Sequence, residues 1–186
     1  MKAIVVTDQA AGTAGMTLVE RPEPSAAIND VVVEVYASGF VPTEMAWPST
    51  WSDRAGRDRT PSIPGHELAG VVTALGYGTT GLSVGQRVFG LTDSYRGGGL
   101  AEYVAIEARN LAPLPGDVDF PVGASLPISG LTAWQGLFVA RPPSGRAERP
   151  CTRRGRCSRG DGDATRARGR RIRHWHGTRR RPSKGA

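Results

Sequence analysis

Cysteine is almost absent from this chain of 186 residues, and the two present, Cys151 and Cys157, both lie near its C-terminal end. Residues 1–138 therefore need no disulfide to fold, which suits a reducing compartment such as the cytoplasm. Long apolar runs are also absent. The first run ends at Asp8, too early for a signal peptide, and none reaches the length of a membrane span. We therefore expect a cytoplasmic protein without membrane contact.

Apolar side chains become scarce after Phe138, where the sizeable ones are Val139, Ile172 and Trp175. The same segment carries 16 Lys and Arg against 3 Asp and Glu, whereas residues 1–138 carry 8 against 14. The formal charges are +13 and −6, which together give the +7 of the whole chain. A segment so poor in apolar area cannot offset the entropy lost on folding. The sequence thus predicts a folded domain at 1–138 and a disordered, Arg-rich tail at 139–186.

The folded part contains short β-branched or apolar runs separated by turn residues. These runs predict strands at residues 2–7, 17–20, 31–37, 68–75, 87–91 and 100–106. Short strands at this spacing are typical of a β-barrel or a sandwich. Two further stretches, 120–126 and 129–138, predict helices, the second with Ser129 as its N-cap. The predicted fold class is mainly β, with helices at the end of the domain.

A glycine-rich segment carries the most specific pattern of the chain. Its core is Gly65-His66-Glu67-Leu68-Ala69-Gly70-Val71-Val72, which places a His-Glu pair at the start of a strand. Gly70 allows another backbone to approach, and the glycines that follow favour tight turns. A His-Glu pair alone is weak evidence for a functional site, because a turn histidine and a strand-edge carboxylate explain it equally well.

The full string resembles the Gly-His-Glu-x-x-Gly-x-Val signature of the medium-chain dehydrogenase/reductase superfamily, which includes zinc-type alcohol dehydrogenases and quinone oxidoreductases. The order and spacing of later pieces agree: Gly85-Gln86-Arg87-Val88, Gly99-Leu100-Ala101-Glu102-Tyr103-Val104 and Leu131-Thr132-Ala133-Trp134. The resemblance covers residues 1–138. It implies a partly open, GroES-like β-barrel, the substrate-side domain of that family, without the doubly wound cofactor domain.

Zinc is not expected, because the ligand set of the family's catalytic zinc is incomplete and that of its structural zinc is absent. Where zinc-dependent relatives place a ligand cysteine, this chain has Val41, and residues 1–138 hold no cysteine for a structural zinc. A catalytic zinc needs about three protein ligands, so His66 and Glu67 do not suffice. The resemblance therefore narrows to the zinc-independent quinone and enone reductase branch, with no metal. His66 is interpreted as a hydrogen-bonding residue of the cleft.

That branch transfers a hydride from NADPH to a conjugated carbonyl compound such as a quinone or enone. The resemblance places Thr43 near the substrate as a candidate catalytic hydroxyl and Thr132 near the nicotinamide. A turn hydroxyl is the simpler explanation for Thr43, and a hydroxyl inside a helix is an equal alternative for Thr132. Candidates for the substrate-binding wall are Phe40, Trp47, Trp51 and His66. Packing of a surface loop is an alternative role for the three aromatic residues.

The dinucleotide-binding domain that follows in this family is not recognisable after Phe138. If the codons of residues 148–177 are translated in a frame shifted by one nucleotide, the product is compatible with a strand, a glycine-rich turn, a helix and a second strand. The hypothesis is that the tail is an out-of-frame remnant of the cofactor domain. We therefore expect this chain to bind no NADPH and to be inactive alone, since half a cleft cannot orient the cofactor.

The composition of the tail allows two other interpretations. An Arg-rich segment with Trp175 between two histidines would bind nucleic-acid phosphates without sequence preference, so the alternative function is a non-enzymatic barrel fragment with such a tail. Basicity that arises from GC-rich codons explains the composition better. Cys151, Cys157, His174 and His176 do not have the spacing of zinc ligands.

Overall fold

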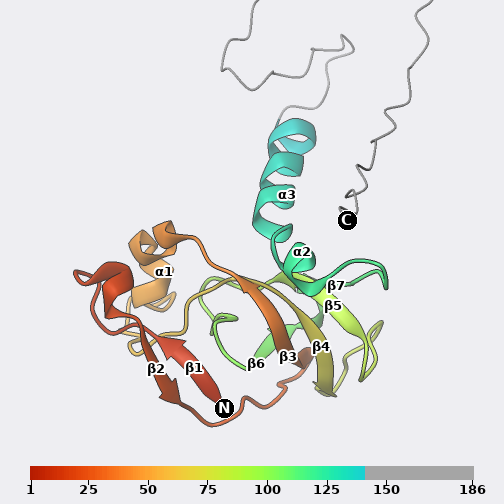
Figure 1. Ribbon diagram of the computed structural model, residues 1–186, viewed down its shortest axis with the longest axis horizontal. Helices are drawn as coiled ribbons and strands as arrows, with labels where there is room; N and C mark the ends of the chain where they lie inside the picture. Colours follow the sequence, from red (N-terminus) through yellow and green to blue (C-terminus); the bar gives the residue numbers. More distant parts are fainter. Residues whose placement is uncertain (141–186) are drawn as a thin grey trace, which may run out of the picture. The chain divides into compact units, whose positions relative to one another are not determined.

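Strands account for most of the regular backbone in the computed structural model, which describes residues 1–140 (Figure 1). A two-stranded antiparallel sheet pairs β1 (Lys2–Val5) with β2 (Thr17–Glu20). A five-stranded antiparallel sheet has the order β6-β3-β4-β5-β7. Its members are β3 (Asp30–Gly39), β4 (Glu67–Leu75), β5 (Arg87–Leu91), β6 (Tyr103–Glu107) and β7 (Leu111–Pro113). Both sheets are open, and the mainly β prediction is confirmed.

Short helical segments join and follow these strands. The α-helices are α1 (Pro48–Trp51), α2 (Phe120–Ala124) and α3 (Pro127–Trp134), and α3 continues into the π-helical turn η4 (Gln135–Val139). Three 3₁₀ turns are η1 (Gly12–Gly15), η2 (Pro42–Ala46) and η3 (Ala108–Asn110). In Figure 1, α2 lies against the sheet and α3 extends away from it. As predicted, α2 and α3 follow the strands in the chain, whereas α1 lies between β3 and β4.

The five-stranded sheet is buried on both faces. Because side chains alternate along a strand, one face gathers the larger core cluster. That cluster contains Val31, Val33, Leu68, Val72, Val88, Val104 and Ile106. The other face carries Ala69, which packs with Leu114 and Ala124 beneath α2. The sheet therefore packs against a core cluster on each face.

Gly70 sits at a close approach of β3 and β4. A Cβ atom at this position would lie 2.0 Å from the carbonyl oxygen of Glu34 and 2.8 Å from a methyl group of Val33. The register between the strands also shifts here, between Val35 and Ala37. The prediction that Gly70 permits a close backbone approach is confirmed.

The predicted strands agree with the observed ones, with differences at their ends. The last of them begins at Tyr103 rather than at residue 100, and β7 and α1 were not predicted. The prediction of Ser129 as an N-cap is wrong, because Pro127 occupies the first turn of α3 and the cap residue is Leu126. Proline suits this position, since the first N–H groups of a helix have no intrahelical partner.

The predictions for the tail concern residues 139–186 and lie almost entirely outside the described residues. The disorder, the frameshift and the phosphate-binding role assigned to it therefore stay predictions, as does the boundary at 138/139. Within residues 1–140, none of the helices has the length and apolar character needed to cross a membrane.

Candidate active site

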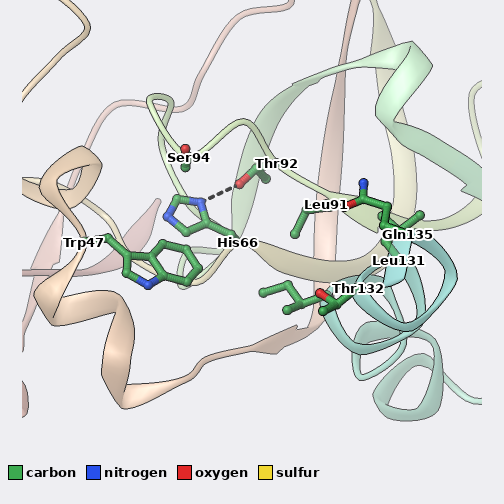
Figure 2. A pocket seen from close by; sticks show the side chains of 9 residues that line it. Trp47, His66, Leu91, Thr92, Ser94, Leu131, Thr132 and Gln135 are labelled. Carbon is green, nitrogen blue, oxygen red and sulfur yellow. Dashed lines mark hydrogen bonds between the residues drawn. The ribbon is translucent and has the colours of Figure 1, made fainter. Parts of the chain in front are cut away.

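A cavity of about 290 Å³ lies where the ends of β4 and β5 meet α3 (Figure 2). The register of the two strands explains its floor. Glu67 pairs with Leu91, so the next residues outward, His66 and Thr92, are also neighbours, and the Thr92 N–H donates to the His66 carbonyl at 2.7 Å. The lining residues are Trp47, His66, Leu91, Thr92, Ser94, Ile128, Leu131, Thr132 and Gln135.

The imidazole of His66 is buried at the centre of this arrangement. Its Nδ1 lies 2.8 Å from the Thr92 hydroxyl oxygen, and its ring stacks on the Trp47 indole, with centroids 5.5 Å apart and planes inclined by 15°. Its Nε2 lies 3.8 Å from Oε2 of Glu44, beyond hydrogen-bond length but within strong electrostatic range. All three contacts hold the ring in one orientation.

Glu44 is completely buried behind His66. Its Oε1 accepts the N–H of Val41 at 3.2 Å, and its Oε2 accepts the N–H of Gly65 at 2.8 Å. Gly65 has φ of +85°, a conformation that favours glycine, so the sequence directs this N–H inward. Burial raises the pKa of Glu44, while the N–H groups of Gly65, Val41 and His66 lower it in part.

Burial also lowers the pKa of His66 to about 4, helped by the positive charge of Arg59 and opposed by Asp93. The Arg59 guanidinium donates to the carbonyl groups of Ser49, Ser94 (3.1 Å) and Arg96 (2.8 Å), which fixes it beside the site. Burial lowers the pKa of Arg59 as well. His66 is therefore a neutral imidazole at pH 7.

Acid is expected to destabilise the chain through His66. The unfolded histidine takes up a proton near pH 6.5, whereas the folded one does so only near pH 4, so between these values acid favours the unfolded state. The free energy of unfolding should fall by about 2 kcal/mol between pH 7.5 and pH 5. Urea unfolding at both pH values measures it.

His66→Gln is the matched variant, because Glu44 and the other titrating groups remain in place. Glu44 acts in the opposite direction, since a carboxyl with a raised pKa in the folded state stabilises the fold as the pH falls. The wild-type chain should lose about 2 kcal/mol more than His66→Gln. An equal loss in the two proteins would contradict the assignment.

Glu67 attaches α3 to the sheet. Its Oε1 accepts the N–H of Ile128 at 2.7 Å, in the first turn of the helix, and its side chain is buried. Thr132 lies one turn further along, where it lines the cavity. The second residue of the His-Glu pair therefore positions the helix that completes the site.

The structure brings together three of the predicted site residues: Trp47, His66 and Thr132 (Figure 2). Phe40, Thr43 and Trp51 are not among the residues that line this cavity. Thr43 is exposed in η2, and the Trp51 Nε1–H donates to the Met45 carbonyl at 2.8 Å. The roles predicted for all six residues stay predictions.

Sequence reasoning missed Glu44 and Thr92. Thr92 follows the strand predicted at 87–91, and His66 precedes the strand predicted at 68–75. An antiparallel pairing of those strands would have placed the two residues together, so a signal existed. Glu44 carried none, because only the tertiary fold buries it.

Residues 1–140 contain no group of three His, Cys, Asp or Glu side chains placed to share a metal ion. Position 41 is a valine, and the two nitrogens of His66 face Thr92 and Glu44. The expectation that the site works without zinc stays a prediction.

A second cavity, of about 590 Å³, shares Leu91, Thr92 and Leu131 with the first. Its polar rim includes the ion pair of Glu107 and Arg109, whose atoms are 2.6 Å apart and whose arginine is largely exposed. It contains none of the predicted site residues. The smaller cavity is therefore the better candidate.

Comparison with known proteins agrees with this geometry. Residues 27–116 match the alcohol dehydrogenase GroES-like domain. A chloroplast envelope quinone oxidoreductase homolog of Arabidopsis thaliana is 29% identical over 143 residues, 74% of this chain and 42% of the relative.

Solved structures give the same picture. A quinone oxidoreductase of Pseudomonas syringae pv. Tomato DC3000 has a TM-score of 0.65 at 27% identity, over 75% of this chain and 41% of the other. A putative zinc-dependent alcohol dehydrogenase protein from Rhizobium etli CFN 42 has a TM-score of 0.67 at 30% identity, over 80% and 44%. The chain spans about two fifths of the length of these relatives.

Proposed function

Since this chain belongs to the medium-chain dehydrogenase/reductase family as a quinone oxidoreductase-like member with a GroES-like domain, we propose that residues 1–138 are the substrate-side domain of an NADPH-dependent reductase. The proposed substrates are quinones, enones and related conjugated carbonyl compounds. NADPH, when bound, supplies the hydride. The cytoplasm is the proposed location.

The main support for this proposal is the cavity between α3 and the ends of β4 and β5. Leu91, Ile128 and Leu131 make it largely apolar, and Trp47 offers a flat aromatic face. Thr132 and Gln135 contribute polar groups from the helix. Apolar walls with a few convergent polar groups are the usual form of a small-molecule site. A flat conjugated carbonyl compound fits these surroundings, with its oxygen directed toward the helix.

Catalysis without zinc is part of the proposal. The ligand position carries the alkyl side chain of Val41, and both nitrogens of His66 face protein groups. Polarisation of the carbonyl then depends on hydrogen-bond donors such as the Thr132 hydroxyl and the Gln135 amide. Ile128 and Leu131 line the cavity beside these donors.

The pocket is tested with 1,4-naphthoquinone, titrated into the 186-residue chain and followed by the indole N–H signals in NMR spectra. We expect the Trp47 signal to shift and Trp47→Leu to weaken binding about tenfold, because stacking on the indole is lost. Trp134→Phe is the control, since Trp134 is exposed on α3 and does not line the cavity. Equal weakening by both variants would contradict the assignment of this cavity.

We also propose that the 186-residue chain alone turns over little substrate, with residues 139–186 as an out-of-frame remnant of the cofactor domain. The support is their charge of +13 and their shortage of apolar residues. Tight binding of NADPH in a fluorescence titration would contradict the first proposal. An intact single reading frame that encodes a matching tail in the gene would contradict the second.

A further inference from the structure

The Thr92 hydroxyl is the polar group of the cavity whose hydrogen-bonding role the surrounding protein decides. We propose that Glu44, acting through His66, fixes this hydroxyl as a hydrogen-bond acceptor toward the cavity, so that the site prefers conjugated carbonyl compounds that also carry a hydroxyl or N–H group. This inference rests on the proposed function, and it names a positioning residue, Glu44, and a specificity-determining residue, Thr92.

The first step concerns the charge of Glu44. Each of its carboxyl oxygens accepts a backbone N–H, from Val41 and from Gly65. A carboxylate can accept at both oxygens, whereas a carboxylic acid has a proton to place on one of them. The two N–H donors therefore favour the ionised form of Glu44 over the protonated form, against the effect of its burial.

The second step concerns the tautomer of His66. The ring is neutral, so one nitrogen carries a hydrogen and the other a lone pair. Nε2 faces the Glu44 carboxylate at 3.8 Å, where an N–H is attracted and a lone pair is repelled. Arg59 does not compete for the ring, since its guanidinium donates to three backbone carbonyls. The hydrogen is therefore on Nε2, and Nδ1 is an acceptor.

The third step follows at Thr92. Its hydroxyl lies 2.8 Å from Nδ1 of His66, and the hydroxyl has a single hydrogen. That hydrogen is donated to Nδ1, so the oxygen turns only lone pairs toward the cavity. Thr92 is 5% exposed, and a ligand donor is therefore the natural partner of this oxygen.

The remaining walls define the rest of the ligand. Thr132 and Gln135 can donate to a carbonyl oxygen, whereas Trp47 and Leu91 contact a flat apolar body. A compound with a conjugated carbonyl at one end and a hydroxyl at the other satisfies both polar edges. A compound without the hydroxyl leaves the oxygen of Thr92 without a partner.

The tautomer is tested directly by ¹⁵N NMR of the histidine side chains at pH 7.5, in the chain without any ligand. We expect Nδ1 of His66 to be the unprotonated nitrogen and Nε2 the protonated one, with His66→Gln used to assign the signals. Glu44→Gln should populate the Nδ1–H tautomer, and the exposed-site control Glu23→Gln should not. A wild-type ring protonated at Nδ1 would overturn the inference.

The preference is tested with two enones, 4-(4-hydroxyphenyl)-3-buten-2-one and its 4-fluorophenyl analogue, which lacks the donor. We expect the hydroxyl compound to bind the wild-type chain about tenfold more tightly, and Thr92→Val to bind both equally. Equal binding of both by the wild-type chain would overturn the inference while the proposed function stands. If neither enone shifts the Trp47 signal, the proposed function fails, and the tautomer still decides the role of Glu44.

Discussion

Replacing Gly70 by alanine should lower the free energy of unfolding by about 3 kcal/mol or more. The added methyl group would lie 2.0 Å from the Glu34 carbonyl oxygen, and a backbone atom cannot move aside as a flexible side chain can. Strands β3 and β4 would have to separate at the centre of the sheet, where Val33 and Val72 are completely buried. Urea unfolding monitored by circular dichroism measures the change.

Gly97→Ala is the matched control, because a Cβ at that position meets no atom within 4 Å. Its effect should stay within about 0.5 kcal/mol, as for most surface substitutions. If Gly70→Ala proved as mild as the control, the close approach of the two strands would be refuted.

Replacing Arg96 by methionine should cost about 2 to 4 kcal/mol of stability. Its guanidinium donates to both oxygens of Asp30, at 2.9 and 2.5 Å, and Asp30 is almost completely buried. The hydrogen bond from Arg96 holds the pKa of Asp30 below its usual value. The pair connects the segment after β5 to the first residue of β3, so its loss leaves a buried charge where the strand begins.

Arg57→Met serves as the comparison, since Arg57 forms a similar ion pair with Asp53 at 2.7 Å but is largely exposed. Solvent screens such a pair, so its removal should change the stability far less than the removal of Arg96 does. Adding Asp30→Asn to the Arg96→Met chain should restore part of the loss, because the uncompensated charge is then gone. Similar costs for the two arginines would argue against the buried pair.

The strands were predictable because each is a run of apolar or β-branched residues bounded by turn residues. The segment 87–91 even has the predicted bounds, and the family resemblance on Gly65 to Val72 is confirmed by the comparisons. The start of α3 was not predictable in this way. Pro127 and Ser129 both suit the beginning of a helix, and the sequence pattern alone does not rank them. The local sequence pattern therefore predicts the presence of strands and helices more accurately than their first and last residues.

The candidate site was predictable only in its parts. Trp47, His66 and Thr132 were singled out one by one, yet nothing in the sequence says that they share a cavity. Thr92 required the register between two strands, and Glu44 required the tertiary contact of η2 with Gly65 and His66. Partners brought together by tertiary contacts are the part that local pattern cannot supply.

The hydrogen bond from the Ile128 N–H to the Glu67 carboxylate holds the start of α3 against the sheet. A Cβ atom at Gly39 would lie 2.6 Å from Oε2 of that carboxylate. The absence of a side chain at Gly39 therefore leaves room for Glu67 to make this hydrogen bond. Beyond it, Leu131 and Thr132 border the ligand space while Trp134 and Leu137 lie exposed to solvent. The width of the cavity therefore depends on the position of α3, because Leu131 and Thr132 belong to this helix.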